Sequence, residues 1–584
     1  MLPYWTPPGR DESGESSEEE EQTVSDAREP SANPPRGENP ASGRRSEQRN
    51  TASDAREQSA GTKWWRDAVV YETYVRSFAD GNGDGVGDLP GIRSRLPYLR
   101  DLGVDALWLT PFYTSPMVDH GYDVADYRDV DPLFGTLEDF DALLTEAHRL
   151  GLRVIIDVVP NHTSSRHPWF QDALAAAAGS SARERYVFRA AAPDDPAPPN
   201  NWTSAFGGPA WSRLEGPDGR PGDWYLHLFA PEQPDLNWRN TEVRREFEEI
   251  LRFWLDRGAD GFRVDVAMGL FKAQGLPDTT HPVHHPSQEG FRESPIWGQP
   301  EVHDIYRRWR QILDSFRGQR MAVAEAWTAG PEDLARYVRS DELHQAFNFS
   351  WLKAPWSAAA FREVIDDSLA ATSLVGATTT WVLSSHDAPR HVTRYGGGSL
   401  GLRRARAALL TTLALPGSAY LYQGEELGLP EVTDLPEEAL QDPIWRRSGY
   451  TQRGRDGCRV PIPWSGARPP YGFSLDGTRP WLPMPEDWGE LSVAAQDRDP
   501  DSTLSFYRRA LRIRREHPAL GDGTLRWLEA PKDTLVFARD PGLVCVLNCG
   551  ENPVRLPDHR RVLLASSPLD GDRLSGNGAV WLAM

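Results

Sequence analysis

The sequence predicts an α/β protein, a (β/α)8 barrel with an inserted subdomain after the third strand and a β domain at the carboxyl terminus. Three observations support this fold class. Short apolar runs alternate with longer helical patterns from Trp64 onward. A segment rich in Pro, Gly and Trp follows the third run, and the end of the chain changes to short alternating runs such as TLVFARD.

Eight apolar runs rich in β-branched and aromatic residues are the candidate strands. A count of eight favours a closed barrel, and an open doubly wound sheet is the alternative on counting alone. The helical patterns between the runs, such as LEDFDALLTEAHRLG, fit the crossovers that parallel strands need. The predicted strands cover residues 68–75, 105–112, 153–159, 260–266, 320–327, 345–350, 379–387 and 418–426.

The chain divides into four predicted parts. Residues 1–60 are rich in Glu, Ser and Pro and offer too few apolar groups to fold, which predicts a disordered acidic tail. Residues 61–162 and 241–515 form the predicted barrel, and residues 163–240 are too long for an ordinary connection and form the predicted subdomain. Residues 516–584 are predicted to form a β-sandwich domain.

Charge and cysteine content limit the possible partners. The formal net charge is -21, with 85 acidic and 64 basic residues. This disfavours binding to nucleic acid or an anionic membrane and favours a neutral small-molecule substrate. Cys458, Cys545 and Cys549 have no metal-ligand spacing and are expected to be reduced thiols. With neither a signal-peptide pattern nor an apolar run of membrane-spanning length, a cytoplasmic protein is expected.

Polar side chains stand at the ends of several predicted strands. Reactive groups of such barrels project from the carboxyl ends of the strands, so these residues are expected to meet at one mouth. One strand-end Asp alone is more often a helix cap or a surface charge, but matches at four strand ends favour a site. The strand-end residues are Asp157, Asn161, His162, Arg263, Asp265, Glu325, His386 and Asp387.

Two of these carboxyl groups suit retaining glycoside hydrolysis, which needs an ionised nucleophile and a protonated acid about 5 Å apart. Arg263 lies two residues before Asp265 on an extended strand, so its cation can hold Asp265 ionised as the nucleophile. Taken alone, this Arg-x-Asp spacing also fits a structural salt bridge. Glu325 lies in the apolar run AEAW, where a carboxyl is more easily kept protonated, as an acid/base requires.

The motifs GVDALWLTPFYTSPMVDHGYDVADY, DVVPNH, QPDLNW, GFRVDVAMGLFK, AEAW and SSHD occur in one order, from about Trp64 to the carboxyl terminus. With these motifs in this order, the sequence resembles the α-amylase superfamily, glycoside hydrolase family thirteen, and especially its oligo-1,6-glucosidase and α-glucosidase branch. The resemblance implies that Asp265 is the nucleophile, Glu325 the acid/base and Asp387 the third carboxylate, which holds sugar hydroxyls. It also implies that the sugar is contacted by Asp119, Tyr122 (as a stacking platform), His162, Arg263, His386 and Arg455.

Three positions bear on differences within this family. Ser385 stands where most members have asparagine before the His-Asp pair, so His386 can be oriented differently. Met268 stands where similar members usually have histidine, so a sugar contact on the leaving-group side can be missing. Val266 resembles the form found in α-1,6-acting members rather than the threonine of maltases.

The stretch from Asp80 to Asp88 alternates oxygen-bearing side chains with glycine, which lets a tight loop aim hard oxygen ligands at a cation. A structural calcium ion is expected, and a solvated acidic turn is the alternative. The loop lacks the glutamate at the twelfth position and the flanking helices of an EF-hand. The family resemblance implies the ligands, which are the side chains of Asp80, Asn82, Asp84 and Asp88 and the carbonyl of Val86.

We therefore expect a retaining exo-α-glucosidase that removes terminal α-1,6- or α-1,4-linked glucose from short oligosaccharides, with no organic cofactor. One alternative is a transglycosylase or isomerase of the same superfamily, such as a trehalose synthase or a sucrose-acting member, because sugar can replace water as acceptor. The other is a non-catalytic accessory subunit of the same fold, which would require losses among the carboxylates. The sequence leaves the oligomeric state open.

Overall fold

A computed structural model describes residues 63–190, 197–215, 221–279 and 294–584. The predicted tail, residues 1–60, lies outside the described residues. The elements below all belong to the unit that contains Lys63–Met584.

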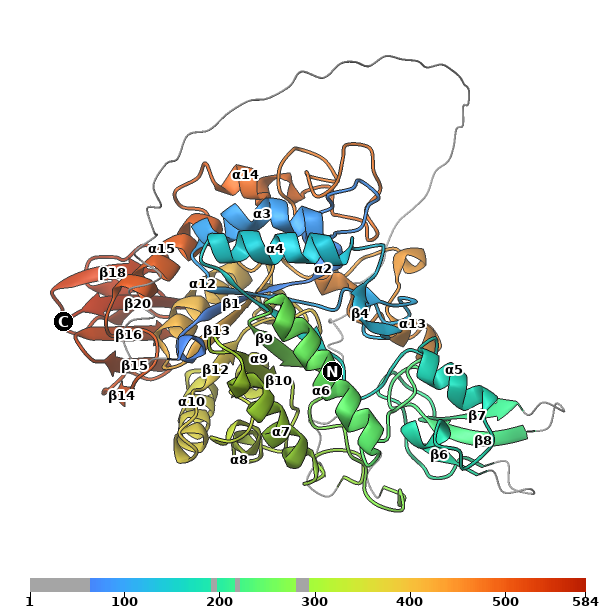
Figure 1. The fold of residues 1–584 in the computed structure, drawn as a ribbon. Coiled ribbons are helices and arrows are strands. Elements are labelled where there is room, and N and C mark those ends of the chain that lie inside the picture. The colour runs from blue at the N-terminus through green and yellow to red at the C-terminus, as the bar shows by residue number, and fades with distance from the viewer. Residues whose placement is uncertain (1–62, 191–196, 216–220, 280–293) are drawn as a thin grey trace, which may run out of the picture. The chain divides into compact units, whose positions relative to one another are not determined.

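Eight parallel strands form one sheet in the order β11-β10-β9-β5-β2-β1-β13-β12 (Figure 1). The sheet is nearly closed into a barrel: the hydroxyl of Thr380 on β12 donates to the carbonyl of Ala346 on β11 (2.5 Å), which links the two end strands. The predicted barrel is confirmed, and each strand lies within its predicted range. The strands are β1 (Val69–Thr73), β2 (Ala106–Leu109), β5 (Arg153–Val158), β9 (Gly261–Val264), β10 (Met321–Ala324), β11 (Gln345–Ala346), β12 (Thr380–Val382) and β13 (Ser418–Tyr422).

Helices connect the strands and cover the barrel (Figure 1). Local signals fix their ends. For example, Thr136 and Asp139 form a capping box at the start of α4, and Gly258 ends α6 in the left-handed conformation. The helices are α2 (Val75–Phe78), α3 (Leu89–Leu102), α4 (Leu137–Arg149), α5 (Pro168–Ala175), α6 (Thr241–Arg257), α7 (Val302–Ser315), α8 (Pro331–Ala335), α9 (Phe349–Lys353), α10 (Ala358–Leu374), α11 (His391–Arg394), α12 (Gly398–Ala414), α13 (Pro443–Arg447), α14 (Val493–Gln496) and α15 (Thr503–Glu516).

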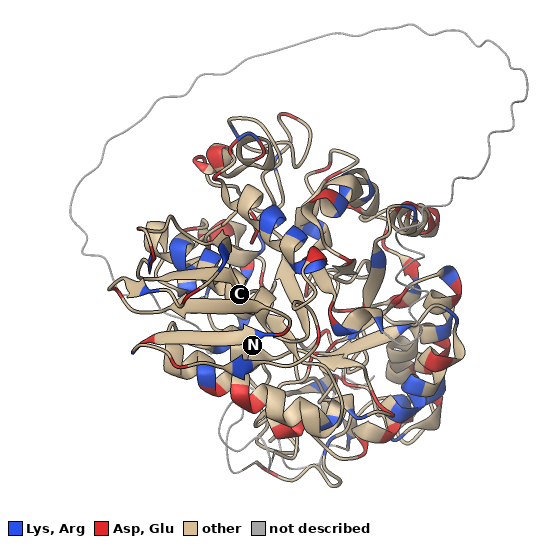
Figure 2. Ribbon diagram, turned by 90° about the vertical axis from the view of Figure 1, so that its left-hand side faces the viewer, with Lys and Arg blue, Asp and Glu red and all other residues tan. Residues whose placement is uncertain are grey.

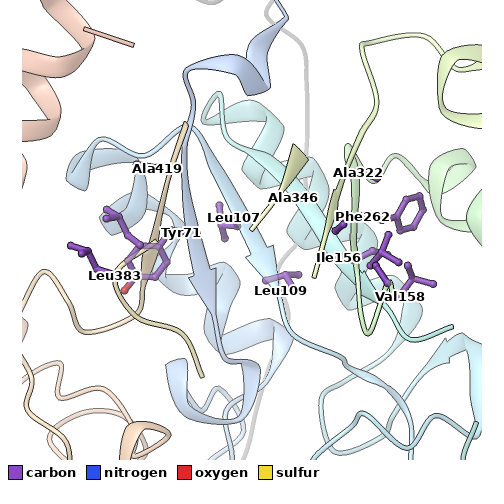
Figure 3. Packing of buried hydrophobic residues seen from close by; sticks show 14 of the residues in the cluster. Tyr71, Leu107, Leu109, Ile156, Val158, Phe262, Ala322, Ala346, Leu383 and Ala419 are labelled. Carbon is purple, nitrogen blue, oxygen red and sulfur yellow. The ribbon is translucent and has the colours of Figure 1, made fainter. Parts of the chain in front are cut away.

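The barrel strands are buried on both faces, because alternate residues face the interior and the helices. Val70, Trp108 and Ile155 belong to a cluster inside the barrel. Leu107 and Ile156 belong to the larger cluster shared with the covering helices, part of which Figure 3 shows. This two-sided burial explains why the strands read as continuous apolar runs, and it makes polar residues at the strand ends conspicuous.

Smaller sheets lie outside the barrel. After β5 the chain forms an antiparallel sheet in the order β6-β8-β7, within the predicted subdomain. A short hairpin of β3 and β4, which the sequence pattern did not predict, follows β2. Near the carboxyl terminus lie a five-stranded and a two-stranded sheet. These strands are β3 (Tyr113–Thr114), β4 (Asp126–Val130), β6 (Phe188–Arg189), β7 (Trp211–Glu215), β8 (Pro221–Leu226), β14 (Arg526–Trp527), β15 (Thr534–Arg539), β16 (Leu543–Asn548), β17 (Val554–Arg555), β18 (Arg561–Ala565), β19 (Arg573–Leu574) and β20 (Gly578–Ala583).

Basic and acidic positions are interspersed along the outer helices in Figure 2. They form exposed ion pairs such as Arg257 with Asp141 (2.8 Å) and Arg308 with Glu248 (2.9 Å), each worth little stability on its own. All three cysteines are free. Within the described ranges, no helix is both long and apolar enough to span a bilayer.

Candidate active site

The carboxyl ends of the barrel strands surround one cavity. Asp265 follows β9, Glu325 follows β10 and Asp387 follows β12, and all three line the cavity. Four other predicted residues line it as well, whereas the predicted contacts Arg263 and His386 lie directly behind this lining. The remaining lining residues come from the DHGYD loop, from the segments after β5, β9 and β10, and from the GRDGCR segment: Asp119, Tyr122, His162, Ala205, Phe206, Phe229, Val266, Met268, Trp297, Trp327 and Arg455.

A single guanidinium holds three of the strand-end carboxylates. Nη1 of Arg263 donates to Asp157 Oδ1 (2.7 Å) and to Asp265 Oδ1 (2.6 Å), and Nη2 lies 3.0 Å from Glu325 Oε2. Arg263 is almost fully buried, so this pairing satisfies its charge away from water. Since Asp265 and Glu325 contact the same guanidinium and both line the cavity, the two carboxyl groups lie close together at one site.

The turn after Asp265 positions Glu325. Val266 has a φ of 44°, a left-handed conformation that is rare and strained for a β-branched residue. This turn directs the Val266 amide to Glu325 Oε2 (2.9 Å), and the indole of Trp327 donates to Glu325 Oε1 (3.0 Å). Both oxygens of Glu325 are therefore fixed by donors.

The environment of Asp265 combines opposing effects. Burial raises the pKa of Asp265 well above its usual value, the Arg263 cation acts against this rise, and the charge of Glu325 adds to it. Burial likewise raises the pKa of Asp157 to about 6, although Arg263 and Trp108 both donate to it. Arg263 is thus the group that favours an ionised Asp265 in this cluster.

Asp387 lies in a more cationic environment. Its Oδ1 accepts from Arg455 Nη1 and from Arg459 Nη2, both at 2.9 Å. Although burial acts to raise it, the pKa of Asp387 is held well below its usual range by His386, Arg455 and Arg459. Arg455 also donates to Asp119 Oδ1 (2.9 Å), so it joins two predicted sugar contacts. Asp387 is therefore held as an ionised carboxylate at the cavity wall.

His386 is held by partners on both ring nitrogens. Its Nδ1 lies 2.5 Å from Glu72 Oε1, and its Nε2 lies 2.8 Å from the hydroxyl of Tyr122. Burial lowers the pKa of His386 and raises that of Glu72. The rings of Tyr122 and His386 are stacked, with centroids 5.4 Å apart, and Tyr122 lines the cavity as a sugar platform would.

His162 lies at the wall near the inserted segment. Its Nε2 is 3.1 Å from Gln233 Nε2, which also donates to Asp119 (3.3 Å). Burial lowers the pKa of His162 to about 3, so the ring is neutral. Gln233 was not singled out from the sequence, although it stands in the QPDLNW motif.

Other site residues also escaped the sequence prediction. Glu72 is a buried carboxyl within an otherwise apolar first strand, a signal that could have found it. Arg459 is the last residue of the GRDGCR motif, from which only Arg455 was predicted as a site residue. Phe206 and Phe229 come from the inserted segment, and no local pattern distinguishes them from core aromatics.

The two departures from the family pattern lie at the site. The hydroxyl of Ser385 accepts from the amide of Asp387 (3.2 Å), so it supports the turn that carries this carboxylate. The His386 ring is held by Glu72 and Tyr122 instead. Met268 lines the cavity and presents no hydrogen-bond donor there.

The predicted calcium loop joins α2 and α3. The carboxylates of Asp80 and Asp88 accept backbone amides of loop glycines, and Asp88 also caps α3. Asn82 and Asp84 are exposed. The donor set is chemically suited to Ca²⁺. However, within the described part of the chain no three His, Cys, Asp or Glu side chains are grouped to hold a metal ion, so the calcium site stays a prediction.

A model of the family described as "Alpha amylase, catalytic domain" matches residues 72–523, well over half of the chain. The chain belongs to the α-amylase family of glycoside hydrolases. The matched range includes all eight barrel strands except the first residues of β1, and it includes every residue lining the cavity.

Individual members of the α-amylase family resemble the chain over most of its length. A probable α-glucosidase of Rhizobium meliloti is 42% identical over 84% of this chain and 90% of that protein. An oligo-1,6-glucosidase of Parageobacillus thermoglucosidasius is 35% identical over 85% and 92%. The crystal structure of XgtA, an α-glucosyl transfer enzyme, covers 89% of this chain and 99% of its own, with 39% identity and a TM-score of 0.80.

Proposed function

We propose that this glycoside hydrolase is a retaining exo-α-glucosidase that removes terminal α-linked glucose from short oligosaccharides. The observation that carries the proposal is the guanidinium of Arg263, which contacts both Asp265 and Glu325 and so places two carboxyl groups at one cavity. α-Glucosidase relatives support the substrate class.

In the proposed mechanism, a carboxylate oxygen of Asp265 attacks the anomeric carbon while Glu325 gives its proton to the departing glycosidic oxygen. This step breaks the glycosidic bond and forms a glucosyl ester on Asp265. Glu325, now ionised, takes a proton from water, and the oxygen of that water attacks the same carbon. Glucose leaves with its α configuration retained, and both carboxyl groups return to their starting states.

The surroundings of Asp387 support action at a chain end. Arg455 bridges Asp387 and Asp119, and Phe206 and Phe229 line the same cavity. We infer that this ion-paired wall closes the end of the cavity around one terminal sugar ring, which would disfavour a continuing chain. Predominant cleavage inside long starch chains would contradict the exo assignment.

The decisive experiment measures hydrolysis of isomaltose, maltose, trehalose and sucrose by the wild type, Asp265→Asn and Glu325→Gln. Each substitution should lower the rate of hydrolysis by on the order of 10³-fold or more. The circular dichroism spectrum should stay that of the wild type. Wild-type rates in either variant would refute its assigned role. The same panel gives the linkage preference, for which Val266 supports α-1,6.

A second candidate is sugar-to-sugar transfer, as in a transglycosylase or isomerase such as a trehalose synthase or sucrose-acting enzyme. It is favoured by the likeness to an α-glucosyl transfer enzyme and by the apolar Met268 in the cavity wall. Chromatography of products formed from each disaccharide separates the two. Free glucose as the main product supports hydrolysis, and new oligosaccharides as the main product support transfer.

We also propose that the loop from Asp80 to Asp88 binds a structural Ca²⁺ ion. Binding would require Asp80 and Asp88 to exchange backbone amides for the cation. Calcium at about 100 times its dissociation constant should then stabilise the protein by about 2.7 kcal/mol, measured as a rise in the thermal midpoint. Asp84→Ala should abolish the rise, and an unchanged midpoint in the wild type would refute the site.

A cytoplasmic location stays a prediction.

A further inference from the structure

The indole of Trp327 forms part of the wall between the catalytic cavity and a second cavity behind it. Trp327 lines both. On the catalytic side its Nε1 donates to Glu325 Oε1 (3.0 Å). The second cavity is lined by the loop after β10, by α8, α9 and α10, and by the start of β12. Trp327 therefore couples helix α9 to Glu325.

Helix α9 fixes this indole with two side chains. Phe349 and Lys353 are four residues apart and thus neighbours on the helix surface. The ring of Phe349 stacks on Trp327, with centroids 3.7 Å apart and planes 7° apart, and the ammonium of Lys353 lies 4.4 Å from the indole centroid. The helix is itself anchored, because Trp351 is fully buried and its indole donates to Thr412.

Lys353 is placed to act electrostatically. Of the described residues that line the second cavity, it is the one with an ionisable side chain, and the others near it present hydroxyls, amides and apolar groups. On the other side, Arg263 lies 3.0 Å from Glu325, and Asp265 and Asp157 interact with Glu325 electrostatically. Burial lowers the pKa of Lys353 to about 8, so the ammonium is kept at neutral pH.

We propose that Lys353 is a positioning residue for the acid/base Glu325, acting through Trp327. A cation over the face of an indole draws electron density from the ring, which makes its N–H a stronger donor. When Glu325 gives up its proton, negative charge develops on its carboxylate, and this N–H stabilises the charge in the transition state. The inference rests on the proposed role of Glu325.

The test compares two substrates that differ in their need for an acid. Maltose or isomaltose, whichever the wild type prefers, has a poor leaving group, whereas α-glucosyl fluoride leaves without protonation. Lys353→Met should lower kcat/KM for the disaccharide by about 10-fold and that for the fluoride by less than about 2-fold.

Matched variants separate this role from a structural one. Lys353→Arg keeps a cation and should restore most of the loss, and Lys532→Met, at an exposed lysine near the carboxyl-terminal sheet, should match the wild type. In a Trp327→Phe background, which lacks the N–H, Lys353→Met should have no further effect. Lys353→Gln repeats the test if Lys353→Met fails to fold by circular dichroism.

Equal losses on both substrates, no loss at all, or a further loss from Lys353→Met in the Trp327→Phe background would overturn the inference. Glu325→Gln, assayed alongside, shows which claim has failed. If it hydrolyses the disaccharide like the wild type, the acid/base assignment falls. If it is inactive on the disaccharide while Lys353→Met behaves as wild type, only the role of Lys353 falls.

Discussion

At the scale of the residue, the site depends on one cation shared among carboxylates. Arg263 contacts Asp157, Asp265 and Glu325 through two nitrogens of one planar group. The Arg-x-Asp spacing allowed the pairing with Asp265 to be predicted, because residues two apart on a strand share a face. Contact with Glu325 could not be predicted, since it depends on how closely β9 and β10 approach.

Arg263→Lys tests this shared cation. A lysine offers one compact charge and cannot contact all three carboxylates with a rigid fork, so kcat/KM should fall by about 100-fold. Arg263 lowers the pKa of Asp265 against the effect of burial. Weakening this pairing should raise that pKa, so the acid limb of the kcat/KM profile should move to higher pH.

The control is Arg308→Lys, at a half-exposed arginine paired with Glu248, which should leave the profile unchanged. A profile of Arg263→Lys whose acid limb coincides with that of the wild type would show that Arg263 does not control the ionisation of Asp265.

At the scale of the element, strands were predictable and loops were not. The eight strands were found because burial on both faces gives continuous apolar runs, and their polar ends marked Asp265, Glu325 and Asp387. The hairpin of β3 and β4 was missed because its strands are short and partly exposed. The loop segments that bring Arg459 to Asp387 and Phe206 to the cavity have no periodic pattern, so tertiary contacts alone decide their positions.

The loop that carries Asp119 and Tyr122 offers an element-scale prediction. Gly121 lies between them with a φ of 108°, and a Cβ there would lie 2.9 Å from the carbonyl oxygen of Pro111. Gly121→Ala should therefore displace the loop and lower kcat/KM by about 10- to 100-fold.

Gly151→Ala is the matched control. Gly151 also has a positive φ, 78°, but a Cβ there meets no atom within 4 Å. The Gly151→Ala variant should lose about 1 kcal/mol of stability from backbone strain and keep the wild-type kcat/KM. Equal kinetic losses in both variants would mean that strain, rather than displacement of the sugar contacts, explains the effect at Gly121.

At the scale of the whole molecule, the fold buries neutral histidines that acid must protonate. Burial lowers the pKa of both His162 and His391 to about 3. His162 belongs to the candidate site, whereas His391 begins α11 and hydrogen-bonds Ser384 (2.8 Å). A histidine in the unfolded chain has a pKa near 6.5, so below that pH the unfolded state binds more protons than the folded state. Stability from each ring is therefore lost as pH falls from about 6.5 towards 3.

His391→Gln isolates this effect from catalysis. Each buried neutral histidine makes the free energy of unfolding fall by about 1.4 kcal/mol per pH unit within that window. Urea unfolding of the wild type and His391→Gln at pH 7 and pH 5 should show a smaller drop in the variant, by about 2 kcal/mol. His559→Gln, at a partly exposed ring, should follow the wild type. If His391→Gln loses as much stability as the wild type between these pH values, His391 is not among the groups whose protonation unfolds the protein.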